Sequence, residues 1–200
     1  MTESSRPTPR RATRADLPVL SGSLARAFRD DPVHRWLFPD PVTRVARNAV
    51  YFTLVLGHVH LRHDEVWTAH GGAAGALWDP PGRWRVPVTT VLRTAPALVR
   101  LLGGRLPVAL AGLRRVEARH PRVPHWYLAV LGTDPSAQGR GLATAALAPV
   151  LERCDAEGLP AYLETATPEN VAFYEARGFT VTGRTTLPRG PELWLMTRSP

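Results

Sequence analysis

A turn rich in glycine, QGRGLA at residues 138–143, joins a run of hydrophobic residues to an amphipathic segment. Gly139 and Gly141 have no Cβ, so the chain can turn sharply and bring its backbone N–H groups close to an anion. The unpaired amides and the positive dipole at the start of a helix favour phosphate groups, and Arg140 adds a cationic donor. The turn is therefore predicted to bind a phosphate or pyrophosphate. The alternative, from these residues alone, is a plain tight turn before a helix.

Two common nucleotide-binding loops are excluded. The P-loop requires a lysine, and all 25 basic residues of this chain are arginines. The dinucleotide-binding fingerprint requires a third glycine near the first βα unit. Here Thr144 stands in that place, and the turn lies two thirds of the way along the chain.

A second motif, ENVAFYEARGF at residues 169–179, contains Asn170 and Tyr174 ahead of a Gly-Phe pair. Together with the glycine-rich turn, it resembles the GNAT family of N-acetyltransferases over about residues 124–200. Within that family, the chain length, the FRDDP segment at residues 28–32 and Pro149 inside a predicted helix are similar to the puromycin N-acetyltransferase type. Residues 80–122 depart from that type, and these residues are expected to set the selectivity for the acceptor.

The resemblance implies that acetyl-CoA is the co-substrate. The strand ending at residues 131–133 would pair with its pantetheine arm, residues 138–143 would hold its pyrophosphate, and Asn170 would contact the arm. The residues implied to bind the cofactor are Leu131, Gly132, Thr133, Gln138, Gly139, Arg140, Gly141, Leu142, Ala143 and Asn170. In this family the sheet splays between the fourth and fifth strands, and the arm lies in the gap.

Tyr174 and Glu164 are the predicted catalytic residues. The resemblance puts the Tyr174 hydroxyl near the thioester sulfur, and a phenol can protonate a departing thiolate. Its alternative role is packing against Val171, one helical turn earlier. Glu164, near the thioester on the next strand, is predicted to accept or orient the amine proton, with a solvated strand-end carboxylate as the alternative. Water relays could replace any such base.

The acceptor site is less well defined. In GNAT folds the loop after the first helix borders the acceptor, which makes Asp31 and His34 candidates for substrate binding. His125, a second candidate base, and Trp126 open the strand at residues 125–132. An ordinary solvated loop, a structural histidine and a core tryptophan are the respective alternatives.

Hydrophobic periodicity and end signals predict mixed strands and helices, and therefore an α/β or α+β class with a mixed sheet. A short strand and a helix capped by Thr13 and Asp16 should occupy residues 10–28. Further helices are predicted at residues 43–60, 88–102, 107–119, 141–157 and 167–178, and strands at residues 65–68, 73–78, 125–132, 160–165, 179–184 and 192–198. The resemblance implies a mostly antiparallel sheet flanked by helices.

The composition predicts a single domain at residues 9–200 after a flexible tail at residues 1–8, with residues 80–124 as a variable helical insert that shapes the acceptor pocket. A single cysteine permits neither an internal disulfide nor a metal cluster, and the polar N-terminus does not resemble a signal peptide. We therefore expect a cytoplasmic protein, monomeric or homodimeric, without a metal or a membrane partner. The net charge of +8 is spread over scattered arginines without interleaved aromatics, so nucleic acid is not expected as a partner.

These observations predict an acetyl-CoA-dependent N-acetyltransferase. It would transfer acetyl directly, in a ternary complex, to a primary amine of a small molecule such as an aminonucleoside antibiotic, and so confer resistance. The alternatives are an amine on a protein or peptide and a non-catalytic acyl-CoA-binding regulatory module.

Overall fold

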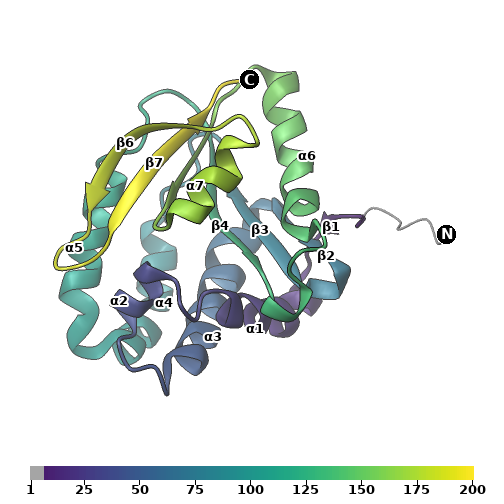
Figure 1. Ribbon diagram of the computed structural model, residues 1–200. Helices are drawn as coiled ribbons and strands as arrows, with labels where there is room; N and C mark the ends of the chain where they lie inside the picture. The colour runs from purple at the N-terminus through teal and green to yellow at the C-terminus, as the bar shows by residue number, and fades with distance from the viewer. Residues whose placement is uncertain (1–6) are drawn as a thin grey trace.

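The structure is a computed structural model that describes residues 7–200. Its central element is a seven-stranded sheet with the order β1-β2-β3-β4-β5-β7-β6 (Figure 1). The strands are β1 (Arg10–Arg11), β2 (Val66–Ala69), β3 (Ala74–Asp79), β4 (Trp126–Thr133), β5 (Ala161–Thr165), β6 (Thr180–Thr186) and β7 (Glu192–Arg198). Every neighbouring pair is antiparallel except β4 and β5, which run parallel. The predicted mixed, mostly antiparallel sheet is confirmed.

Helices cover both faces of the sheet (Figure 1). They are α1 (Leu17–Ala27), α2 (Pro32–Leu37), α3 (Arg44–Val55, extended by a π-helical turn at Leu56–His60), α4 (Val88–Leu102), α5 (Leu106–Glu117), α6 (Leu142–Glu157) and α7 (Pro168–Glu175). On one face α6 and α7 pack over a core that includes Leu147, Leu163 and Phe179. On the other face α1 and α3 pack around Leu24 and Phe52. The sheet is therefore buried on both sides at its centre.

The chain enters the fold through β1, followed by a 3-10 turn at Arg14–Asp16 that leads into α1. The predicted capping box of Thr13 and Asp16 is present, with the Thr13 backbone N–H donating to the Asp16 carboxylate at 2.7 Å. The Thr13 hydroxyl also donates to that carboxylate, at 3.1 Å. Of the predicted tail at residues 1–8, residues 1–6 lie outside the described residues. Pro7 and Thr8 have no regular secondary structure.

The sheet splits between β4 and β5. Only three residue pairs join them, from Trp126 opposite Ala161 to Leu128 opposite Leu163. Immediately beyond the last pair, the register of β4 against β3 shifts so that Ala129 is an extra residue on β4. A bulge of this kind bends its strand. The bend at Ala129 therefore turns the second half of β4 away from β5 and produces the expected splay.

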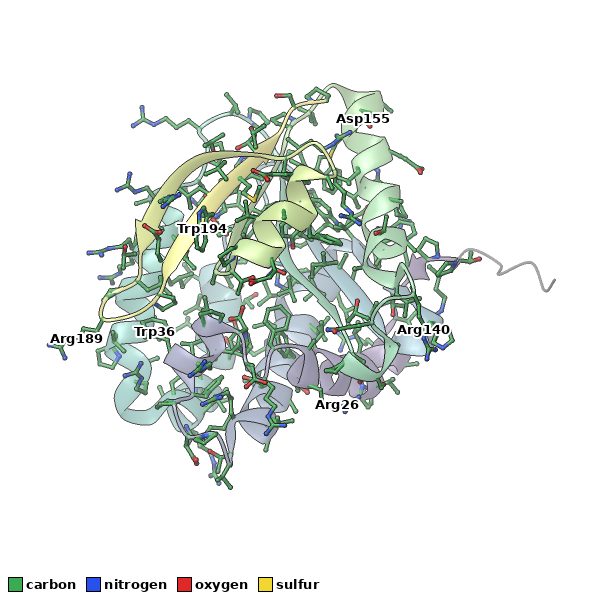
Figure 2. The ribbon with its side chains drawn as sticks, viewed as in Figure 1. Arg26, Trp36, Arg140, Asp155, Arg189 and Trp194 are labelled. Atoms are coloured by element: carbon green, nitrogen blue, oxygen red, sulfur yellow. The ribbon has the colours of Figure 1, made fainter. Side chains whose placement is uncertain are left out.

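The insert at residues 80–124 forms α4 and α5, close to the predicted ranges. It is fastened to the far end of the sheet by Arg115, which donates to the Thr186 carbonyl at 2.8 Å, and by the Trp36 ring of α2, which packs on Gly112 of α5. Trp36 in turn donates from Nε1 to the Pro188 carbonyl at 3.0 Å, and Figure 2 shows it close to the β6–β7 turn. This end of the sheet is therefore covered by α2 and α5 together.

Much apolar surface of α4 and α5 is exposed, including Val88, Leu92, Val99 and Leu113. By length and composition alone, Val88–Glu117 could cross a membrane, and 17% of its most apolar window is buried. A 3-10 turn at Gly103–Arg105 divides this stretch into the two helices.

Candidate active site

A cavity of ≈ 600 Å³ opens beside the C-terminal half of β4, between the start of α6, α7 and the α1–α2 loop. Its lining includes all of the sequence-predicted cofactor residues except one: Leu131, Gly132, Thr133, Gln138, Gly139, Gly141, Leu142, Ala143 and Asn170. The exception is Arg140, which is exposed and does not line the cavity. Figure 2 shows Arg140 beside the start of α6, on the outer surface of the molecule. The structure thus brings two motifs, distant in sequence, to one cavity.

The loop before α6 has the geometry of an anion-binding turn. Gly139 and Gly141 adopt φ values of +75° and +73°, which favour glycine, although a Cβ at either position would meet no atom within 4 Å. Gly141 is the N-cap of α6, and its carbonyl accepts from Ala145 N–H at 3.0 Å. The N–H groups of the first turn have no acceptor within the helix. The positive end of α6 therefore faces the cavity with free backbone donors.

Asp134 fixes the loop at its start. Its carboxylate accepts from Ser136 N–H at 3.0 Å and from the Ser136 hydroxyl at 2.7 Å, and its backbone N–H donates to the Ala73 carbonyl at 2.8 Å. Hydrogen bonding from Ser136, together with the Arg26 guanidinium, holds the pKa of Asp134 below its usual value. The Asp134 carboxylate is therefore ionised at neutral pH, and the Asp134 backbone N–H ties the loop to Ala73, the residue before β3.

The edge of β4 beyond Leu128 forms one wall of the cavity. Because β5 has turned away, the backbone groups on this edge have no strand partner among the described residues. Gly132 of β4 is closely packed against α1. A Cβ on Gly132 would lie 2.8 Å from Leu24 Cδ2 and 2.9 Å from Phe28. An extended polar chain could satisfy this unpaired edge as a strand would.

Tyr174 lies on α7, lines the cavity and is 7% exposed. Burial raises the pKa of its hydroxyl, the Arg177 charge lowers it, and the nearby Asp31 charge raises it again, with a net upward shift. The hydroxyl is thus protonated at neutral pH and can donate. Tyr174 packs edge-on against Phe179 as well as lining the cavity, so it serves both packing and the site.

The end of α7 holds Tyr174 in place. Phe179 N–H donates to the Tyr174 carbonyl at 3.2 Å and Gly178 N–H donates to the Glu175 carbonyl at 3.0 Å. Gly178 has φ +84°. This is the hydrogen-bond pattern of a Schellman motif, with Gly178 at the predicted C′ position.

Arg177 is a cavity residue that the sequence reasoning missed. Its Nη2 donates to the Thr144 hydroxyl of α6, its guanidinium lies 3.4 Å from the Phe173 ring centre, and its Nε is buried without a described partner. Burial lowers its pKa. The sequence signal was present, since Arg177 lies inside the second motif. Arg177 places a cation on the α7 side of the cavity.

Glu164 does not line this cavity, but it stands on β5 as the first residue beyond the last β4–β5 pair. Its side chain is 9% exposed. Oε2 accepts from the Tyr127 hydroxyl at 3.0 Å, and Oε1 lies 3.4 Å from Nε2 of His120. Glu164 is therefore a buried carboxylate where the strands part, rather than a solvated strand-end residue.

The four predicted acceptor residues are dispersed. Asp31 lines the cavity, although its Oδ1 also caps α2 by accepting from Val33 and His34 N–H. His34 is buried, stacked on Phe52, and its Nδ1 is 2.8 Å from Asn48 Oδ1.

Trp126 and His125 also lie away from the cavity. Trp126 is 3% exposed, in the core beneath α6, and donates to Glu157. His34 and Trp126 are therefore core residues, and neither lines the cavity. His125 lines a second cavity at the opposite end of β4.

Among residues 7–200, no group of three or more His, Cys, Asp or Glu side chains is arranged to hold a metal ion. Cys154, the only cysteine, is buried in the core, where burial raises the pKa of its thiol to about 12.

Comparison with known proteins identifies the family. Residues 62–179 match the acetyltransferase (GNAT) family. An uncharacterized N-acetyltransferase of Schizosaccharomyces pombe is 28% identical over 190 residues, which cover 85% of this chain and 73% of the relative.

Two solved structures are similar along nearly their whole length. A histone acetyltransferase HPA2 and related acetyltransferase from Corynebacterium glutamicum is 28% identical, covers 98% of this chain and 97% of its own, and superposes with a TM-score of 0.73. The Drosophila melanogaster polyamine N-acetyltransferase has the same fold at 16% identity, with a TM-score of 0.66 and coverage of 97% and 100%. From the match over residues 62–179, together with the split sheet and the loop before α6, this chain belongs to the acetyltransferase (GNAT) family of N-acetyltransferases.

Proposed function

We propose that this N-acetyltransferase moves the acetyl group of acetyl-CoA directly to a primary amine of a small molecule, in a ternary complex. The observation that carries the proposal is that one ≈ 600 Å³ cavity is lined by the loop before α6, the unpaired edge of β4, and Asn170 and Tyr174 of α7. In this proposal the first-turn amides of α6 hold the pyrophosphate and the β4 edge pairs with the pantetheine arm. Tyr174 donates a proton to the departing thiolate.

Direct transfer is supported by the residue types of the cavity lining, in which the structure of residues 7–200 places no thiol. An acetyl-enzyme intermediate would need an activated side chain, most simply a thiolate. Cys154 lies on the buried face of α6, and its raised pKa keeps the thiol protonated. No cysteine or serine is among the described residues that line the cavity.

The acceptor is proposed to bind as a cation. Asp30 and Asp31, on the α1–α2 loop, line the same cavity. The Asp31 charge lies near enough to Tyr174 to raise the pKa of its hydroxyl. Carboxylates at a site mouth attract a protonated amine. Aminonucleosides are proposed as acceptors because of the sequence resemblance. Polyamines are proposed as well, because the chain has the same fold as the Drosophila polyamine N-acetyltransferase.

The test is release of free thiol from acetyl-CoA, measured against a panel of aminonucleosides, aminoglycosides, polyamines, amino acids and short peptides with a free N-terminus. Turnover with a small amine supports the proposal, and saturation kinetics with intersecting double-reciprocal lines support a ternary complex. Parallel lines would instead indicate an acetyl-enzyme. Turnover only with peptides would assign the acceptor to the protein class.

A further inference from the structure

Once the acidic residues are counted, the net charge of the chain falls in one segment, the insert at residues 80–124. Of the 25 arginines and 17 acidic residues of the chain, nine arginines and a single acidic residue, Glu117, lie in this insert, which leaves 16 of each elsewhere. The insert therefore carries a net charge of +8, as large as that of the whole chain.

This positive charge is not compensated within the structure of residues 7–200. Every ion pair described for an arginine lies outside the insert. Two of the insert's arginines, Arg105 and Arg115, donate instead to the backbone carbonyls of Trp36 and Thr186. Eight of the nine are exposed. The insert therefore presents its cationic side chains to its surroundings.

The same insert holds most of the exposed apolar side chains. Among residues 7–200, twelve large hydrophobic side chains are exposed, and eight of them lie between residues 86 and 123. In α4, Val88, Leu92 and Val99 lie within about 40° of one another around the helix axis, because successive residues turn by about 100°. In α5, Leu110 and Leu113 are a similar pair at helical spacing. These five side chains form exposed apolar stripes on the two helices.

The other side of each helix is already used for packing. Leu101 and Leu102 of α4 pack with Phe38 in a small core, and Leu106 and Ala109 of α5 pack against the same core. Figure 1 shows α5 at the edge of the molecule, on the side away from α6. A helix that is apolar on all sides is typical of a buried one. The exposed stripes therefore lie where this core does not cover them, which suits a surface that binds a partner.

Arginines stand beside the apolar stripes. Arg93 and Arg100 are seven residues apart, so they share one side of α4, about 100° around the helix from the stripe. In α5, Arg114 lies one turn beyond Leu110. A long arginine side chain can keep its guanidinium at a polar layer while its apolar neighbours lie deeper. Aliphatic and cationic side chains side by side on one helix are typical of helices that lie in a membrane interface.

This chemistry distinguishes the possible occupants. A second copy of the chain would bring two segments of charge +8 together, and like charges oppose such a contact. A nucleic acid would pair its phosphates with the arginines but leave the valine and leucine side chains in water. An anionic bilayer surface offers partners to both kinds of side chain.

The stretch Val88–Glu117 is long and apolar enough to span a bilayer, but its packing favours a place on the surface. Five arginines interrupt it, and a charged side chain at the centre of a bilayer is costly. Leu102 and Leu106, on either side of the turn between α4 and α5, also tie it to the folded domain. Spanning would break this core, whereas binding to a surface leaves it intact.

We propose that α4 and α5 form a docking surface for an anionic lipid bilayer, to which the protein binds peripherally. The apolar stripes enter the headgroup region, and the arginines beside them contact lipid phosphates. No residue of the insert lines the ≈ 600 Å³ cavity, so docking leaves the lining of that cavity unchanged. The proposal goes beyond acetyl transfer and replaces the expectation of no membrane partner.

The first experiment measures co-sedimentation with vesicles made of equal parts of phosphatidylglycerol and phosphatidylcholine. We expect binding at low salt, little binding to vesicles of phosphatidylcholine alone, and loss of binding near 1 M salt, where the Debye length is about 3 Å. Arg93→Gln with Arg100→Gln should lower the partition coefficient about 25-fold, at about fivefold for each arginine. Arg14→Gln with Arg140→Gln removes two exposed arginines outside the insert and should have little effect.

The second experiment tests the apolar stripe separately. Leu92→Gln with Val99→Gln should lower the partition coefficient about tenfold, because apolar area is no longer transferred from water. Val19→Gln with Val181→Gln changes two exposed apolar residues outside the insert and is the matched control. Thermal unfolding checks that each variant is folded. If the α4 variant is not, Leu110→Gln with Leu113→Gln tests the stripe on α5.

The third experiment identifies the face that meets the lipid. Cys154 is buried, so an environment-sensitive fluorophore can be attached selectively to the new thiol of a Leu92→Cys variant. We expect its emission to shift to the blue when anionic vesicles are added. The same label on a Val19→Cys variant, on α1, should not respond.

Three results would overturn the proposal. The first is no binding to the anionic vesicles at low salt. The second is binding that the Leu92 and Val99 substitutions leave unchanged, because it would show a general attraction to polyanions, nucleic acid included. The third is a dimer of the lipid-free protein, measured by analytical ultracentrifugation, that these two substitutions disperse, which would assign the surface to self-association. None of these results depends on acetyl transfer, so the proposed function is tested independently.

Discussion

Arg26 of α1 and Asp134 before the glycine-rich loop, 108 positions apart in sequence, form an ion pair in which both Nε and Nη2 of Arg26 donate to Asp134 Oδ2, the first at 2.7 Å. The pair joins the first helix to the start of the proposed pyrophosphate loop. Arg26 is half exposed and Asp134 is buried. The loop geometry therefore depends on a contact across the whole domain.

Arg26→Ala should raise the KM for acetyl-CoA about three- to fivefold and leave kcat nearly unchanged, because an exposed pair contributes about 1 kcal/mol or less and acts here on the binding loop. Steady-state thiol release measures both constants. Arg10→Ala, which removes a similar two-hydrogen-bond pair with Asp16 far from the loop, is the control. An equal rise in KM in both variants would contradict a specific role.

Tyr174→Phe should lower kcat by about 10²-fold and leave the KM for acetyl-CoA nearly unchanged, because only a donated proton is lost. Because the Tyr174 pKa is raised, the hydroxyl is the acid form throughout the neutral and mildly alkaline range. The wild-type kcat should therefore show no alkaline loss from this group up to about pH 10, the ordinary pKa of tyrosine. An unchanged kcat in the variant would remove Tyr174 from the mechanism.

Gly139→Ala should weaken acetyl-CoA binding, whereas Gly158→Ala should not. Both glycines have positive φ, +75° and +64°, and neither has an atom within 4 Å of an added Cβ. Each variant should lose a similar 1–2 kcal/mol or so of stability through backbone strain. Calorimetric titration with acetyl-CoA, together with thermal unfolding, separates the two effects. Equal affinities for acetyl-CoA would show that the loop before α6 is not the binding element.

Cys154 should not react with a disulfide reagent in the folded protein. Burial both blocks access and raises its pKa to about 12, so the thiolate is scarce at pH 8. We expect one thiol per chain to appear only after denaturant is added. Rapid labelling of the native protein would mean that the packing beneath α6 opens, and it would also disturb thiol-release assays.

Local patterns predicted most helices and strands because their ends carry strong signals. Thr167 and Gly178 bracket α7, and β4 is a nearly continuous run of apolar residues that ends at Asp134 and Pro135. The loop before α6 was predictable for the same reason, since Gly139 and Gly141 set its backbone. Arg140 is exposed and does not line the cavity, which the sequence could not show, because sequence alone does not reveal toward which side of a turn a side chain points.

The surroundings of Glu164, formed by His120, Tyr127 and Tyr162, could not be predicted, because they depend on contacts between distant segments. His120 and Glu164 meet only after α5 packs against α2 and the β6–β7 turn. The neighbouring tyrosines did carry a signal: Tyr127 and Tyr162 lie opposite each other in parallel strands and so share one face. Predicting that these two tyrosines share a face would have required knowing the register of β4 against β5.

The bulge at Ala129 leaves the protein, when no ligand fills the gap, with an unpaired strand edge inside its own sheet. Such an edge is a template for an extended segment of another molecule. A ligand bound in the gap would cover this edge and so would also prevent self-association. Preparations without CoA should aggregate sooner than those that contain it.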